Sequence, residues 1–159
     1  MATHWKEKWD VIFLLDVVEH CPDDVSIFNQ AYESLKPGGL LFVSTPALMC
    51  FWSYNDESMN HLRRYSLSDY EKLATLTKFK LIDARYFMFF LSPLYWLSRK
   101  VKPKGLSKKE IENAIEREHK VPNSFINFLL SKIFSAESPI GHYVRFPWGT
   151  SVLGVFEKS

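Results

Sequence analysis

The stretch Asp10–Asp24, DVIFLLDVVEHCPDD, begins as an unbroken apolar run and ends in acidic, histidine, cysteine and proline residues. Val11–Leu15 is continuously apolar rather than alternating, which is typical of an interior parallel strand that helices cover on both faces. The polar residues Asp16–His20 stand where this strand ends. In open parallel sheets, ligands bind beyond the carboxyl ends of the strands. The stretch therefore predicts a buried strand that leads into a ligand-binding edge.

The segment that follows completes a strand–helix–strand unit. Apolar residues recur at helical spacing and predict one helical face, formed by Val25, Phe28, Ala31, Tyr32 and Leu35. Asp23 or Asp24 can cap the start of this helix, and the run Lys36–Gly39 favours its end. Leu40–Ser44 reads as a second strand, closed by Pro46. Because such units are right-handed with parallel strands, residues 16–20 and 45–52 should share one crevice.

Four further elements are predicted downstream. Residues 66–77 predict a helix with two candidate capping boxes, Ser66 with Asp69 and Ser68 with Glu71, and with an inner face of Tyr70, Leu73, Ala74 and Thr77. Residues 79–87 and 149–158 predict a third and a fourth strand. Residues 103–121 are highly charged and predict a helical excursion.

Composition sets wide bounds on function. With 159 residues, 47% of them hydrophobic, the chain is long enough for one domain with a sizeable core. Its 20 basic and 18 acidic residues give a charge of +2, too small an imbalance to indicate a nucleic-acid partner. Cys21 and Cys50 lack the spacing of metal ligands, so we expect no metal site. No leader or spanning segment is evident, and we expect a cytoplasmic location.

Residues 13–46, FLLDVVEHCPDDVSIFNQAYESLKPGGLLFVSTP, resemble the second half of a class I S-adenosylmethionine-dependent methyltransferase, from its fourth strand to its fifth. The segment HLRRY at 61–65 and the end PWGTSVLGVFEK at 147–158 are similar to the remainder of such enzymes. The resemblance covers nearly the whole chain and is weak from Lys102 to Arg145. It implies an α/β fold: a partial Rossmann-like sheet with strands in the family order four, five, seven, six, the last strand antiparallel, and helices on its faces.

The family's glycine-rich cofactor loop has no counterpart in this sequence. None of the six glycines forms a Gly-x-Gly loop after a strand. We therefore expect one truncated methyltransferase domain over residues 1–159, which corresponds to the carboxyl-terminal half of the family's fold. It should consist of five parts: a strand–helix–strand core at 10–46, a substrate or lid segment at 47–66, a helix, strand and aromatic segment at 67–101, a charged helical excursion at 102–145, and a terminal strand at 146–159. Without its first-strand neighbour, Asp10–Leu15 should present an exposed edge that favours self-association.

Candidate site residues fall into three groups. The resemblance implies that Leu15, Asp16 and Val17 contact the methionine part of S-adenosylmethionine. His61 could accept a proton from a hydroxyl or amine acceptor, and His20 is a second catalytic candidate. The alternative for the strand end is that its acids and His20 only cap and solvate a turn.

The third group is expected to bind substrate and comprises Trp52, Tyr54, Arg63, Arg64 and Tyr65. Aromatic rings at a strand end can meet the cationic sulfonium, and arginines can fork onto a phosphate or carboxylate. The alternative is lid packing, with His61 and the arginines paired to Asp56 and Glu57. Six aromatic residues between Arg85 and Leu97 precede a basic stretch, a pattern of either a membrane interface, a lipid-like substrate pocket or core packing.

Three functions follow from these observations. The leading one is methyl transfer from S-adenosylmethionine to a small-molecule acceptor, lipid- or glycan-related, with this chain inactive alone. The alternatives are a non-catalytic remnant that serves as an interaction module, and half of a nucleotide-dependent oxidoreductase, because fold does not determine function. The expected partners are a small molecule, a peripheral membrane surface and a second copy of the chain, but no nucleic acid.

Overall fold

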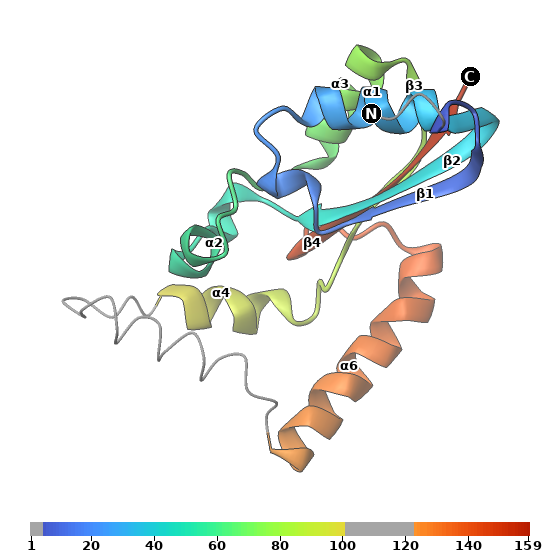
Figure 1. Cartoon of the computed structure of the whole chain (residues 1–159). Helices are drawn as coiled ribbons and strands as arrows, with labels where there is room; N and C mark the ends of the chain where they lie inside the picture. Colours follow the sequence, from blue (N-terminus) through green and yellow to red (C-terminus); the bar gives the residue numbers. More distant parts are fainter. Residues whose placement is uncertain (1–4, 101–122) are drawn as a thin grey trace.

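The computed structural model describes residues 5–100 and 123–159 (Figure 1). Four strands form one sheet: β1 (Trp9–Leu15), β2 (Leu35–Pro46), β3 (Phe79–Phe87) and β4 (Ser151–Lys158). The helices are α1 (Asp24–Ser34), α2 (Tyr54–Ser58), α3 (Leu67–Thr77), α4 (Ser92–Lys100) and α6 (Ser124–Tyr143), with short 3₁₀ turns η2 (Val18–His20) and η3 (Met49–Phe51).

The sheet has the order β1-β2-β4-β3. β1 and β2 are parallel, and β4 lies antiparallel between β2 and β3. This arrangement confirms the predicted fold class, the strand order and the antiparallel last strand. Because β1 and β2 are parallel, their carboxyl ends meet at the same edge of the sheet.

The helix boundaries follow from capping side chains. The carboxylate of Asp23 accepts a hydrogen bond of 2.8 Å from the backbone N–H of Ser26 at the start of α1. Of the two candidate boxes before α3, the structure uses Ser66 with Asp69. These caps determine where α1 begins after β1 and where α3 begins after the segment that follows β2.

The run Lys36–Gly39 differs from its prediction. We expected it to end the helix as a separate turn, but α1 ends at Ser34 and these residues lie within the span of β2. The pairing jumps from Trp9 opposite Leu35 to Val11 opposite Leu40, so the run is an irregular bulge in the strand. Gly38 has a φ of 74°, which glycine adopts readily and which lets the chain bend here.

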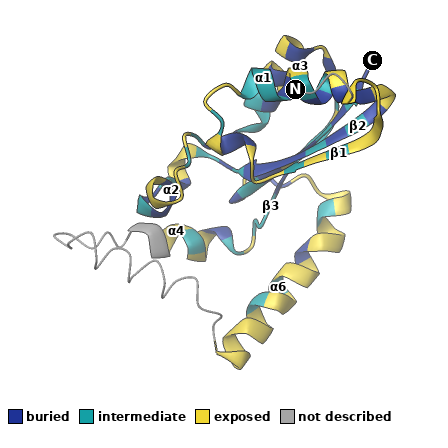
Figure 2. Ribbon diagram, viewed as in Figure 1, coloured by how far each residue is buried: buried dark blue, intermediate teal, exposed yellow. Residues whose placement is uncertain are grey.

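The hydrophobic core lies between the sheet and the helices α1 and α3 (Figures 1 and 2). Phe28 of α1 and Phe156 of β4 are fully buried, with ring centroids 5.1 Å apart in an edge-to-face arrangement. The predicted inner face of α3 is buried as expected, at Tyr70, Leu73, Ala74 and Thr77. The helical periodicity in the sequence therefore identified the correct faces.

β1 is not covered on both of its faces, in contrast to our prediction. Ile12 and Leu14 pack against the core, whereas Val11, Phe13 and Leu15 are exposed, Phe13 to 62% (Figure 2). The physical reason is that β1 is an edge strand of the described sheet, and α1 and α3 cover only one face.

α4 and α6 lie on the other side of the sheet from α1 and α3 (Figure 1). α6 is fastened by the carboxylate of Glu137, which accepts hydrogen bonds of 2.9 Å from the backbone N–H groups of Phe89 and Phe90. Arg85 donates to the carbonyl of Gly141. The predicted charged helix at 103–121 lies outside the described residues. Over the residues described, no helix has both the length and the apolar character needed to cross a membrane.

Candidate active site

The carboxyl edge of β1 and β2 has an unusual backbone. Asp16 ends β1 with a φ of 52°, in the left-handed region that non-glycine residues rarely adopt. β2 holds it there, because the Asp16 N–H donates to the carbonyl of Ser44 at 2.9 Å and the Ser44 hydroxyl donates to its carboxylate at 3.3 Å. Leu48 and Asn60 have the same kind of φ, 57° each. Such strained residues concentrate at functional sites.

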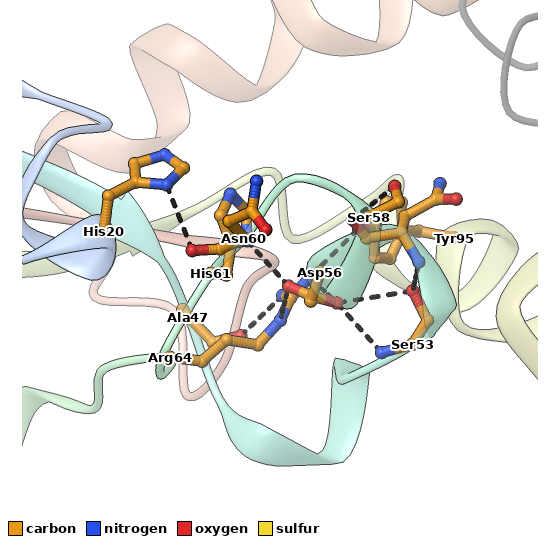
Figure 3. Close-up of polar contacts among 10 residues, drawn as sticks. His20, Ala47, Ser53, Asp56, Ser58, Asn60, His61, Arg64 and Tyr95 are labelled. Carbon is orange, nitrogen blue, oxygen red and sulfur yellow. Dashed lines mark hydrogen bonds and ion pairs between the residues drawn. The ribbon is translucent and has the colours of Figure 1, made fainter. Parts of the chain in front are cut away.

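Asp56 is the hub of the segment that follows β2 (Figure 3). It stands at the third position of α2, and its carboxylate accepts from the backbone N–H of Ser53 in a capping box. Both carboxylate oxygens also accept from the Arg64 guanidinium, at 2.8 and 3.1 Å. Oδ1 lies 3.0 Å from Nδ1 of His61. One buried carboxylate therefore fastens the segment and orients a histidine.

The charge on Asp56 follows from these contacts. Burial raises the pKa of the Asp56 carboxyl, but hydrogen bonds from Arg64 and His61 outweigh burial and hold that pKa below its usual range. The ionised carboxylate can only accept, so the proton between the two side chains belongs on Nδ1 of His61. In the neutral form of His61 with this tautomer, the lone pair is on the other ring nitrogen, Nε2.

Two backbone contacts dock this segment onto η2. Leu62 donates its N–H to the carbonyl of Glu19 at 2.8 Å, and the His20 Nδ1 lies 3.4 Å from the carbonyl oxygen of Asn60 (Figure 3). As a result, the rings of His20 and His61 meet edge to face, with centroids 4.8 Å apart. The two predicted catalytic histidines, far apart in the sequence, are neighbours in the structure.

Glu19 lies beside these histidines and is fully buried. Neither of its carboxylate oxygens has a hydrogen-bond partner within residues 5–100 and 123–159. Burial raises the pKa of the Glu19 carboxyl; the charge of Asp16 adds to this, and His61 and His20 act in the opposite direction. Glu19 therefore lies close to both histidines at the strand edge.

The residues predicted to contact the cofactor lie at the open end of β1. Leu15 and Val17 are exposed to 54% and 41%, and Asp16 is exposed between them. These exposed residues stand at the edge where the family resemblance locates the methionine part of the cofactor. The role of these three residues stays a prediction.

Most of the residues predicted to bind substrate form hydrogen bonds within the protein. Arg63 donates to the Asp24 carboxylate and to the carbonyl of Pro22, both at 2.9 Å, and the Tyr65 hydroxyl donates to Asp24 at 3.0 Å. Burial and the neighbouring Asp24 raise the pKa of Tyr65. Arg64 is buried against Asp56. These contacts resemble the alternative of lid packing, with Asp24 in place of Glu57 as the partner of Arg63.

Trp52 and Tyr54 are half-buried where η3 passes into α2. Beside them, a pocket of about 280 Å³ opens between η3 and α4. Its lining is largely apolar and includes Leu48, Phe51, Pro93, Trp96 and Trp148. An apolar portion of a ligand fits such a lining.

Sequence reasoning missed the importance of two acids. It treated Asp56 only as an ion-pair partner and Glu19 as a structural residue. Asp56 carries one local signal, the capping box with Ser53, but its contacts to His61 and Arg64 depend on the turn at Met59 and Asn60. The adjacent pair Glu19 and His20 was visible, whereas the approach of His61 was not.

The chain is similar to known proteins in sequence and in fold. Residues 2–86 match the family model described as a methyltransferase domain. A 45-residue segment is 42% identical to the ubiquinone biosynthesis O-methyltransferase of Pseudomonas savastanoi, covering 28% of this chain and 19% of that protein.

Two solved structures share the fold. One is phosphoethanolamine N-methyltransferase 2 of Haemonchus contortus in complex with S-adenosyl-L-methionine, with a TM-score of 0.52, 18% identity, and coverage of 96% of this chain and 34% of that one. The other is an S-adenosylmethionine-dependent methyltransferase of Mesorhizobium loti, with a TM-score of 0.51, 10% identity, and coverage of 96% and 63%. The chain thus spans less than two thirds of each of these proteins. The family match extends over more than half of the chain, and the chain belongs to the methyltransferase-domain family of class I S-adenosylmethionine-dependent enzymes.

Proposed function

We propose that this chain supplies the acceptor side, and part of the cofactor edge, of an enzyme that methylates a hydroxyl group of a small molecule. S-adenosylmethionine is the methyl donor of the family, and its sulfonium makes the methyl group electrophilic. Leu15, Asp16 and Val17 would hold its methionine part. The exposed end of β1, followed by Asp16 that Ser44 holds in place, supports this role because all three residues are accessible to solvent.

His61 would prepare the acceptor. Its Nδ1–H is directed at the ionised Asp56, so Nε2 can accept the hydroxyl proton as the acceptor oxygen bonds to the methyl group. Asp56 then stabilises the imidazolium that forms. Arg64 keeps Asp56 ionised and oriented, and so acts as a positioning residue. Positioning supplies much of the acceleration in such transfers.

The observation that carries this proposal is the docking of residues 60–62 onto η2, which follows the proposed cofactor edge. Leu62 donates its N–H to the carbonyl of Glu19, and the ring centroids of His20 and His61 lie 4.8 Å apart. The proposed cofactor-binding residues and the proposed proton acceptor therefore belong to adjoining segments. The family match favours methyl transfer over the oxidoreductase alternative.

The acceptor should carry an apolar part, which would occupy the pocket between η3 and α4. Phe51, Trp96 and Trp148 line this pocket, and a lipid-related acceptor suits it better than a glycan. The name of the Pseudomonas relative, a ubiquinone biosynthesis O-methyltransferase, is consistent with a hydroxyl on an apolar molecule. The exposed apolar residues of α4, Leu94 and Leu97, would suit contact with a membrane surface that delivers it.

Calorimetric titration tests the proposal. S-adenosylmethionine and S-adenosylhomocysteine are titrated into the chain, into Asp16→Ala and into His61→Asn. We expect weak binding, in the range of tens to hundreds of micromolar, that Asp16→Ala weakens and His61→Asn leaves unchanged. Equal binding by all three proteins contradicts the assignment of Asp16. No heat with either titrant contradicts cofactor binding by this chain and favours the non-catalytic remnant.

A further inference from the structure

The buried Glu19 carboxylate is the most unusual polar group of the described residues. Its side chain is inaccessible to solvent, and neither oxygen has a hydrogen-bond partner within the part of the chain that the structure describes. A buried charge is costly unless it is paired or coordinates a metal ion. A buried acid of this kind is suited to a partner other than the side chains of residues 5–100 and 123–159.

The side chains that face Glu19 are metal ligands by type. One potential ligand atom from each of Glu19, His20 and His61 lies within 4.8 Å of the other two. A carboxylate with two imidazoles is a common ligand set for Zn²⁺ and for divalent iron, with further positions open to water or a ligand. Three side chains from two separate segments therefore converge on one point.

The hydrogen-bonding contacts of His20 and His61 also support a metal site. Nδ1 of His61 faces the Asp56 carboxylate at 3.0 Å, and Nδ1 of His20 faces the carbonyl oxygen of Asn60 at 3.4 Å (Figure 3). Metal-binding histidines usually donate their other ring N–H to a carboxylate or a backbone carbonyl, which fixes ring orientation and tautomer. Each ring is left with Nε2 as the nitrogen for a ligand.

The spacing needs only a small adjustment. Ligand atoms around a tetrahedral zinc ion are roughly 3.4 Å apart, since zinc binds nitrogen and oxygen at about 2.0–2.2 Å. Closing from 4.8 Å is within reach of side-chain rotations, because His20 is exposed and Glu19 has no bond to break in the described residues. Asp56 keeps His61 in place during this closure.

We propose that Glu19, His20 and His61 form a binding site for a divalent transition metal ion, with Zn²⁺ as the representative ion, at the carboxyl edge of the sheet. We expected no metal site from the sequence, because Cys21 and Cys50 lack the spacing of metal ligands. The site combines an adjacent pair on η2 with a histidine brought in by the docking of residues 60–62.

The metal would also change the chemistry of the site, and this part rests on the proposed function. With three protein ligands, the ion has a position for an acceptor hydroxyl, whose proton it would make more acidic. Metal and proton compete for the same lone pair of His61. An enzyme with bound metal would therefore need no base at His61, and the histidine would act as a ligand instead.

Titration of the 159-residue chain with ZnCl₂ tests the site without cofactor or acceptor, so its outcome is independent of methyl transfer. We expect one Zn²⁺ per chain with a dissociation constant of micromolar or below. Glu19→Gln and His61→Asn should each weaken binding by about 10- to 100-fold. Replacing Zn²⁺ by Co²⁺ should give visible absorption bands that shift in Glu19→Gln. MgCl₂, which prefers oxygen ligands, should give no binding.

Two controls keep the test specific. Cys21→Ser removes the thiol nearest to His20 in the sequence, and His142→Asn removes an imidazole on α6 outside the site; both should bind Zn²⁺ like the unmodified chain. Circular dichroism of Glu19→Gln without metal should show an intact fold. Binding that survives in Glu19→Gln and His61→Asn, that requires Cys21, or that occurs only at millimolar Zn²⁺ overturns the proposal.

Discussion

Oδ1 of Asp56 lies 3.0 Å from Nδ1 of His61 and 2.8 Å from Nε of Arg64, and so joins a candidate proton acceptor to a buried guanidinium. The side chains of Asp56 and Arg64 are exposed to only 1% and 3%. Removing this one carboxylate leaves a buried positive charge without its partner.

Asp56→Asn is therefore expected to lower the free energy of unfolding by about 3 kcal/mol, because breaking a buried ion pair costs far more than breaking an exposed one. Urea denaturation measures this. Asp10→Asn is the matched control: Asp10 pairs with Lys36, and both side chains are largely exposed, so little change is expected. Equal effects of the two substitutions would contradict the role of Asp56 as a structural hub.

The same contacts predict acid sensitivity. The pKa of Asp56 is lower in the folded chain than its ordinary value of 3.8, so its contribution to stability is present above that value and is lost as the pH falls through the lower, folded value. Thermal unfolding should be measured between pH 7 and pH 2 for the unmodified chain and for Asp56→Asn. The unmodified chain should be the more stable of the two at neutral pH, and the difference in stability should become smaller below pH 3.8. A difference that is constant with pH would mean that Asp56 is not preferentially ionised in the fold.

Glu19→Gln is expected to stabilise the metal-free chain by about 1 kcal/mol at neutral pH, because a buried carboxylate with no hydrogen-bond partner among the described residues is replaced by a neutral group of similar size. The pKa of Glu19 is raised in the fold, so the unmodified chain gains stability as the pH falls through that raised value towards 4.5. The advantage of Glu19→Gln should shrink over the same range. Melting curves measured in EDTA check this, and destabilisation at pH 7 would argue that the polypeptide already satisfies the carboxylate.

The exposed face of β1 predicts self-association. Val11, Phe13 and Leu15 are exposed on the uncovered face of β1, which is an edge strand of the described sheet, and exposed apolar edge strands pair with other chains. Phe13→Asp should lower the weight-average mass measured by light scattering at high concentration. Phe125→Asp, which removes an exposed aromatic residue from α6, is the matched control and should leave the mass unchanged. A monomer at all concentrations for the unmodified chain contradicts the prediction.

Gly154 on β4 has no room for a side chain. A Cβ there would lie 2.5 Å from Cδ2 of Tyr70, whose ring is fully buried and whose hydroxyl lies 3.0 Å from that of Thr45. Gly154→Ala should therefore destabilise the chain by about 1–3 kcal/mol through overpacking. In Gly141→Ala on α6 the nearest atom would be 3.5 Å away, and this control should be neutral or slightly stabilising.

The fold was largely predictable from the sequence because its elements have clear local signals. Helical periodicity and caps identified α1 and α3, and apolar runs identified all four strands. The relative order of β4 and β3 came from the family resemblance. The exposure of Phe13 was not predictable from the run itself, because a continuous apolar strand has the same sequence whether or not its second face is covered.

The site was predictable only in part. The strand-end residues follow from topology, since ligands bind where parallel strands end. The contact of His61 with Asp56, and its approach to His20, depend on a turn with a left-handed residue at Asn60 and on docking of residues 60–62. Such contacts join distant segments, and no local pattern encodes them.

The position of β4 has a consequence for how the chain is made. The last strand is the piece that joins β2 to β3, so neither neighbour has its full set of hydrogen bonds until residues 151–158 are in place. During translation β2 and β3 are made before β4, so the sheet can close only once residues 151–158 have been synthesised and can reach it. Until then the inner edges of β2 and β3 are open to chaperones or to other chains.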